Sequence, residues 1–159
     1  MAKLQKSRDN PILMIQIEYP TYAHQIKSLD HKEQIFDPFR KIWVRLTPEE
    51  WVRQNFLQVL VQKQDIPASL IAIEKEIKWG ETKKRFDILV YKDTKPWLIV
   101  ECKEMNVPLS ESVLQQVLHY NSKLETQYII ITNGNDTFGF DIRNGQPTVM
   151  HALPNFVTG

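Results

Sequence analysis

Two apolar runs separated by a short polar turn constrain the fold of this chain more than any other feature. The segments RFDILVY (85–91) and PWLIVECK (96–103) have the composition of strands, and the polar residues 92–95 between them suit a tight turn. Strands joined so closely pair antiparallel. The second strand ends unusually, because Glu101 and Lys103 follow a run of core-type residues. Charges are seldom buried without a partner or a task.

Side-chain alternation divides the second strand between the two faces of the sheet. Over residues 97–103 it places Trp97, Glu101 and Lys103 on one face and Cys102 on the other. We therefore expect Cys102 to be a small core residue rather than a nucleophile.

The length of the loop decides which residue faces Glu101 across the two strands. A loop of three residues (93–95), with Lys92 paired to Pro96, brings Asp87 directly opposite Glu101. A two-residue loop would place Asp87 on the wrong face of the sheet. We therefore predict the three-residue loop, or an equivalent bulge.

Two carboxylates facing each other in a sheet predict a bound cation. Like charges directly opposite each other are destabilising, so Asp87 and Glu101 need compensation beyond Lys103. Hard oxygen ligands suit Mg²⁺ or Mn²⁺. Lys103 beside that ion would orient or deprotonate a water, or stabilise charge on a phosphate. The simpler alternative is a solvated Glu-x-Lys pair of the kind common in strands.

The remaining segments predict a mixed α/β chain. Thr47 suits an N-cap, Pro48 the first helical position and Glu50 the third, where it completes a capping box. Residues 19–38 show no clear pattern. The expected elements are strands at 12–18, 40–46, 70–79, 127–132 and 137–142 and helices at 48–63 and 111–124, the second capped by Ser110. We expect them to form one mixed sheet with helices packed against it.

Composition excludes several classes of protein. A chain of 159 residues with 42% hydrophobic residues is typical of one globular domain, and no apolar run is long enough for a membrane span. A single cysteine excludes an intramolecular disulfide and cysteine-rich zinc sites, which favours a cytoplasmic setting. A net charge of +1 argues against DNA binding by overall charge. It leaves room for a local basic patch, whose candidates are Lys75, Lys78, Lys83, Lys84 and Arg85.

Four short segments together resemble a known family. TPEEWVRQ, RFDILVY, LIVECK and QQVLHY are similar to the N-terminal endonuclease domain of type I restriction enzyme R subunits, within the PD-(D/E)XK nuclease superfamily. The resemblance covers residues 47–142. It implies an α/β (α+β), restriction-endonuclease-like fold with a mixed central sheet flanked by helices. It also implies a nuclease-like domain over 47–159, preceded by an N-terminal extension (1–46) whose strands pack on the core.

The resemblance assigns roles to individual residues. Asp87 and Glu101 match the metal-binding acids, Lys103 matches the catalytic lysine, and the backbone carbonyl of Cys102 would be a further ligand. Gln116 and Tyr120 match the Gln-x-x-x-Tyr pattern of the family, although they would also suit the polar flank of an amphipathic helix.

Such nucleases often carry another acid on the first helix, and two residues compete for this role. Glu50 is accounted for by the capping box, so we favour Glu49, whose i+4 neighbour is Arg53. A surface Glu–Arg pair is the simpler alternative for Glu49.

The sequence therefore predicts a Mg²⁺- or Mn²⁺-dependent nuclease that acts on DNA. Lys78, Lys83, Lys84 and Arg85 would contact the DNA backbone, and Tyr120 is a further candidate for nucleic-acid binding. No translocase motif follows in the 159 residues, so we expect a motor or specificity subunit as a further partner. The alternatives are a DNA-binding or partner-dependent module without activity alone, and a protein-interaction domain.

Overall fold

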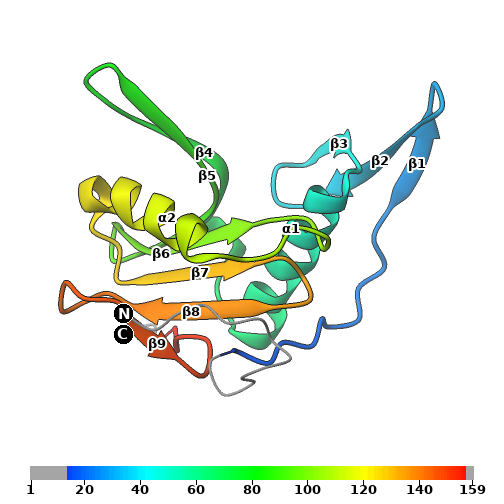
Figure 1. The fold of residues 1–159 in the computed structure, drawn as a ribbon. Helices are drawn as coiled ribbons and strands as arrows, with labels where there is room; N and C mark the ends of the chain where they lie inside the picture. Colours follow the sequence, from blue (N-terminus) through cyan, green and yellow to red (C-terminus); the bar gives the residue numbers. More distant parts are fainter. Residues whose placement is uncertain (1–13, 157–159) are drawn as a thin grey trace.

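A computed structural model describes residues 14–156, and residues 1–13 and 157–159 lie outside the described part. The described chain forms a six-stranded mixed sheet, a separate three-stranded antiparallel sheet and two α-helices (Figure 1). The large sheet has the order β4 (Ile71–Trp79), β5 (Thr82–Lys92), β6 (Lys95–Cys102), β7 (Tyr128–Thr132), β8 (Thr137–Asp141), β9 (Thr148–Met150). The small sheet has the order β1 (Ile26–Leu29), β2 (Lys32–Asp37), β3 (Ile42–Arg45).

The two α-helices cover opposite faces of the large sheet. Helix α1 (Pro48–Gln58), extended by a π-helical turn (Val59–Lys63), packs against residues such as Val100 and Cys102. Helix α2 (Glu111–Leu124) packs against the other face, which includes Ile99. All strand pairs are antiparallel except β6 and β7, which α2 connects as a crossover. The predicted mixed central sheet flanked by helices is therefore confirmed.

The turn between β5 and β6 reaches the predicted register by a different route. Lys92 pairs with Lys95, so the loop has two residues, and the predicted three-residue loop is wrong. Asp93 and Thr94 adopt left-handed φ values of 51° and 66°, as a tight hairpin turn with the sheet's own twist requires. A register shift then restores the pairing of Ile88 with Val100. Continued by one residue, this register brings Asp87 opposite Glu101, so the equivalent bulge is confirmed.

The bulge also corrects the expected direction of Trp97. Tyr91 pairs with Pro96 and Val90 with Leu98, so Trp97 is the extra residue of β6. Its side chain packs with Leu98 in the core beneath α1, instead of sharing the face of Glu101. A single inserted residue resets the alternation of everything on one side of it.

The N-terminal part of the chain differs most from the expectation. Residues 26–37, which showed no clear pattern, form a hairpin, and β3 joins it to make a sheet of its own. The expectation of one sheet is therefore wrong. Of the strand predicted at 12–18, residues 12 and 13 lie outside the described part, and 14–18 form no strand. The backbone N of Ile15 donates a hydrogen bond of 2.8 Å to the backbone O of Thr137, and the Ile15 side chain is buried. The apolar residue thus packs in the core although its segment is not a strand.

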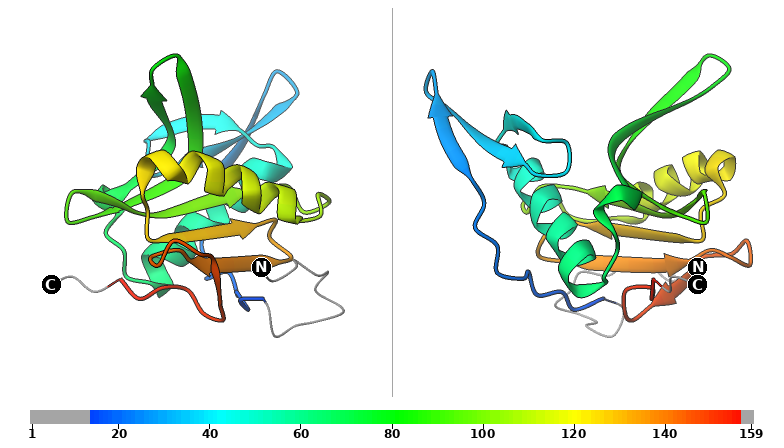
Figure 2. Two further views of the ribbon diagram at one scale, coloured as in Figure 1. Left: turned by 60° about the vertical axis from the view of Figure 1, so that its left-hand side comes forward. Right: turned by 180° about the vertical axis from the view of Figure 1, so that it is seen from behind.

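Two arms project from the body of the molecule. Figures 1 and 2 show the far part of the β4–β5 hairpin and the β1–β2 hairpin rising on opposite sides of the central sheet. Helix α1 lies close to the base of the β1–β3 sheet in these views. Within residues 14–156, no helix has the length and apolar character needed to cross a membrane.

The two helix caps differ, which gives a matched test of local stability. Thr47 Oγ1 accepts a 3.0 Å hydrogen bond from the backbone N of Glu50, whereas the Ser110 side chain makes no cap bond. Thr47→Ala should lower the free energy of unfolding by about 1 kcal/mol, because it leaves an N–H unpaired. Ser110→Ala should cost clearly less. Urea denaturation measures both, and equal losses would contradict the assignment of the caps.

Candidate active site

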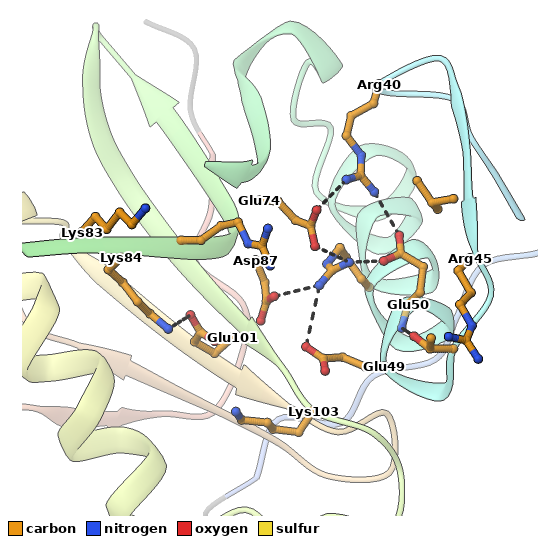
Figure 3. A pocket seen from close by; sticks show the side chains of 14 residues that line it. Arg40, Arg45, Glu49, Glu50, Glu74, Lys83, Lys84, Asp87, Glu101 and Lys103 are labelled. Atoms are coloured by element: carbon orange, nitrogen blue, oxygen red, sulfur yellow. Dashed lines mark hydrogen bonds and ion pairs between the residues drawn. The ribbon is translucent and has the colours of Figure 1, made fainter. Parts of the chain in front are cut away.

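A cavity of about 590 Å³ opens between the two arms, at the edge of the large sheet (Figure 3). Its walls come from α1, from β4 and β5, from the end of β6, and from the β2–β3 segment. The lining residues are Arg40, Val44, Arg45, Thr47, Glu49, Glu50, Arg53, Glu74, Lys83, Lys84, Arg85, Asp87, Glu101 and Lys103. All three residues of the predicted Asp–Glu-x-Lys set are among them.

Asp87 is fixed by two hydrogen bonds. Its Oδ1 accepts from Arg53 Nη2 at 2.9 Å, and its Oδ2 accepts from the backbone N of Cys102 at 2.9 Å. The second bond crosses from β5 to β6, next to Glu101. Asp87 therefore faces Glu101, as the register argument predicted.

Glu101 is buried, and its carboxylate is not fully hydrogen-bonded. Its residue is 6% exposed, and its Oε1 has no hydrogen-bond partner in the described structure. Lys84 Nζ lies 3.9 Å from Oε1, which is too long for a hydrogen bond. Burial and the neighbouring Asp87 raise the pKa of Glu101 from 4.5 to about 8, against the lowering effect of Lys84 and Lys103. Two adjacent carboxylates cannot both be ionised cheaply in a buried site unless a cation joins them.

Lys103 follows β6 directly and lines the same cavity as Asp87 and Glu101. Its backbone N donates to Thr132 O at 2.8 Å, which continues the β6–β7 ladder and fixes the start of its side chain. Its charge lowers the pKa of both Glu101 and Glu49. Cys102, which lies between Glu101 and Lys103 in the sequence, is fully buried in the core, as expected. Burial raises the pKa of its thiol well above the ordinary value.

The two candidate acids of the first helix occupy different environments. Glu50 is buried, and its oxygens are taken by Arg40, Arg53 and Gln54. Its side chain is thus not folded back onto Thr47, so the reciprocal half of the predicted capping box is wrong. Arg53 and Gln54 of the same helix and Arg40 of the β2–β3 turn take its oxygens instead. Glu49 lies 3.7 Å from Arg53 Nη2 and keeps a half-exposed side chain on the cavity.

Electrostatic coupling connects Glu49 to the predicted metal ligands. Burial and then the charge of Asp87 raise the pKa of Glu49, while Arg53 and Lys103 lower it. Glu49 is therefore the first-helix acid with free oxygens near the pair, and its role in the site stays a prediction.

Two arginines, the buried Arg53 and the partly buried Arg40, organise the acids, although the sequence did not indicate either as a site residue (Figure 3). Arg53 is 4% exposed and contacts Glu50, Glu74 and Asp87. Arg40 contacts Asp37 at 2.5 Å, Glu74 at 3.0 Å and Glu50 at 3.1 Å. Glu74 has a left-handed φ of 51° and interrupts the β4–β5 pairing opposite Asp87. The only advance signal was the spacing of Arg53 from Glu49 and Glu50 along the helix.

The predicted DNA-contacting residues divide into two groups. Lys83, Lys84 and Arg85 line the cavity. Lys78 lies further along the hairpin, opposite Lys83, with its Nζ 3.8 Å from Glu76.

The two residues of the Gln-x-x-x-Tyr pattern lie on α2. The ring of Tyr120 stacks near Trp79, and Lys84 Nζ lies 5.3 Å from its centroid. Tyr120 is thus connected to the cavity through Lys84. Gln116 is exposed and lies outside the cavity lining. The functions of both residues stay predictions.

The donor set fits a hard divalent ion bound largely through water and substrate. Over residues 14–156, no three His, Cys, Asp or Glu side chains come together as a complete metal site. The pair Asp87 and Glu101 supplies two carboxylates, including one buried oxygen without a partner. Mg²⁺ is typically held by one or two carboxylates plus waters and phosphate oxygens.

The fold and the cavity define a mixed α/β domain with paired acids on β5 and β6 and a lysine directly after β6. A comparison with protein-family models matches residues 48–155 to the family described as type I restriction enzyme R protein N terminus. This match spans more than half of the chain, so the chain belongs to that family.

Part of the chain is also similar to a solved structure. Among solved structures, a fragment of an HsdR subunit of a type I restriction enzyme from Vibrio vulnificus is similar, with 25% sequence identity and a TM-score of 0.41. The similarity covers 54% of this chain and 19% of the solved one, so this chain spans only a small part of that protein's length. A search of curated proteins found no match.

The raised pKa of Glu101 predicts a specific pH dependence of stability. Between pH 4.5 and about 8, the folded protein keeps a proton on Glu101 that the unfolded chain has lost. The free energy of unfolding should therefore fall as the pH rises through this window. In EDTA, the wild type should lose more stability across the window than Glu101→Gln, whose side chain stays neutral. Urea denaturation at both ends of the window tests this, and equal losses would contradict it.

The arginine network gives a second stability prediction. Arg53→Ala removes a partner from the buried Glu50 and from the partly buried Glu74 and Asp87, and it should cost about 3–5 kcal/mol. Arg143→Ala breaks a surface pair with Asp141 and should cost less than about 1 kcal/mol. Thermal or urea unfolding compares the two variants, and similar losses would show that the Arg53 network is not structurally important.

Proposed function

We propose that this chain is a metal-dependent nuclease domain that hydrolyses phosphodiester bonds in DNA, with a PD-(D/E)XK, restriction-endonuclease-like arrangement of its site. The observation that carries the proposal is the juxtaposition of Asp87 and the buried Oε1 of Glu101, which has no hydrogen-bond partner in the described structure. Lys103 lies on the same cavity. Membership of the type I restriction enzyme R protein family supports a nuclease role in restriction.

Asp87, Glu101 and the backbone carbonyl of Cys102 would hold Mg²⁺ or Mn²⁺. Such an ion polarises a phosphate oxygen and lowers the pKa of a bound water, which supplies a nucleophile at neutral pH. It would also remove the electrostatic conflict that raises the pKa of Glu101, because both carboxylates would then be ionised toward a common positive charge.

The chain's own cations would carry the rest of the reaction. The Lys103 ammonium would orient the attacking water or stabilise the negative charge that develops on the phosphate. Lys83, Lys84 and Arg85 on the neighbouring wall would hold the DNA backbone in place. Glu49 would help to orient water from the opposite side of the cavity, while Arg53 keeps Asp87 aimed at Glu101.

A second candidate function is a DNA-binding module that depends on a partner for turnover. The observation in its favour is that Oδ1 of Asp87 is already bound by Arg53. A motor or specificity subunit of a restriction complex would then be needed to rearrange this contact. The two candidates differ in whether the isolated chain binds metal.

Cleavage assays test the first candidate directly. Plasmid DNA incubated with the purified chain and Mg²⁺ or Mn²⁺ should be cleaved, and EDTA should stop the reaction. Lys103→Ala should reduce the rate by about 100-fold or more, the range expected for loss of an acid–base or charge-stabilising group. Lys123→Ala, an exposed lysine of α2, is the matched control. Activity retained in Lys103→Ala would overturn the assignment of that residue.

Calorimetry separates the two candidates. If the site is competent alone, Mn²⁺ should bind the wild type and release protons near neutral pH, because the pKa of Glu101 is about 8 without metal. Asp87→Asn should weaken this binding. A wild type that binds no Mn²⁺, with or without DNA, would favour the partner-dependent module.

A further inference from the structure

We infer that the N-terminal three-stranded sheet forms a second DNA-binding wall of the cavity and that Arg45, at the end of β3, is its phosphate contact. The inference rests on the proposed function, because it takes DNA as the ligand. It concerns a segment outside residues 48–155, the part matched to the family. It adds a residue that neither the sequence patterns nor the family assigned.

The arginines divide into two groups by their partners. Of those within residues 14–156, Arg40, Arg53 and Arg143 are each paired with carboxylates. Arg45 and Arg85 make no ion pair or side-chain hydrogen bond with the described part of the chain, and both line the cavity. The cavity lining has seven basic and five acidic side chains, so the guanidinium groups that have no acidic partner among the described residues are available for an external anion.

The unpaired cations occupy opposite walls. Lys83 and Arg85 belong to β5, whereas Arg45 belongs to β3 of the other sheet. Figure 3 shows Lys83 and Arg45 on opposite sides of the acids Glu74, Glu50 and Asp87. A phosphodiester backbone lying across the cavity would meet cations on both walls, and a guanidinium binds phosphate through two parallel hydrogen bonds.

The second wall is held firmly relative to the acids. Arg40, in the turn between β2 and β3, connects Asp37 of its own sheet to Glu50 of α1 and Glu74 of β4. Asp37 is fully buried and also accepts backbone hydrogen bonds from the same turn. Arg45 ends β3, whose preceding turn is held by Arg40, and it lies only two residues before the Thr47 cap of α1. The backbone on both sides of Arg45 is therefore fixed.

Binding of a short fluorescein-labelled DNA duplex tests the inference without relying on cleavage. Anisotropy would be measured over a series of NaCl concentrations, in EDTA and again in Ca²⁺. Arg45→Ala should bind about fivefold to tenfold more weakly near 0.1 M salt, with a salt slope smaller by about 0.9, as loss of one phosphate contact predicts. Arg45→Lys should keep the slope and recover part of the affinity.

Lys32→Ala is the matched control, since Lys32 is an exposed cation of the same sheet that lies outside the cavity lining. It should stay within about twofold of the wild type, because a distant exposed charge is screened by salt. An Arg45→Ala variant that binds like the wild type, or no more weakly than Lys32→Ala, overturns the inference and leaves the nuclease proposal intact.

The two proposals fail in different ways. Duplex binding that depends on Arg45, without cleavage in Mg²⁺ or Mn²⁺, supports the second wall and counts against independent nuclease activity. A wild type that binds no duplex under either condition overturns both. Thermal unfolding of Arg45→Ala should match the wild type, because the exposed side chain has no partner to lose within the described residues.

Discussion

The buried guanidinium of Arg53 is the interaction on which the rest of the site depends. It joins an acid of its own helix, Glu50, to Glu74 and Asp87 on two strands of the large sheet. A buried charge is tolerated only when it is paired, so the position of α1 over the sheet and the position of Asp87 are set together. Arg40 extends the same arrangement to the N-terminal sheet.

The arginine network does not neutralise both of the facing acids, Asp87 and Glu101. Asp87 is satisfied by Arg53 and a backbone N–H, whereas Glu101 has a buried oxygen without a hydrogen-bond partner among the described residues. Burial and repulsion favour the neutral form of Glu101, and a divalent cation would favour the charged form. This imbalance supports the proposal that the site binds a cation, and the basic side chains on both walls of the cavity would suit the phosphate groups that such an ion would share.

Much of the fold could be predicted because the signals are local. The bounds of α2 follow from helical periodicity, and β6 from an apolar run. The β1–β2 hairpin was missed because all of β1 is exposed and because one of the two buried residues of β2 is Asp37, so no apolar alternation marks these strands. The bulge at Trp97 was foreseen only as an alternative, since loop length and bulge position can compensate for each other in the register.

The sequence by itself predicted that Asp87 would face Glu101 across two paired strands and that Lys103 would share that face, with either a three-residue loop or a bulge to set the register. The alternation of a strand and the register of a short hairpin depend only on neighbouring residues. Only the tertiary structure decided that Arg53 and Arg40 hold those acids, that the oxygens of Glu50 are taken by Arg40, Arg53 and Gln54, and that Arg45 reaches the cavity from a separate sheet. These partners lie on different elements, and an ion pair depends on where the elements pack, which no local pattern encodes.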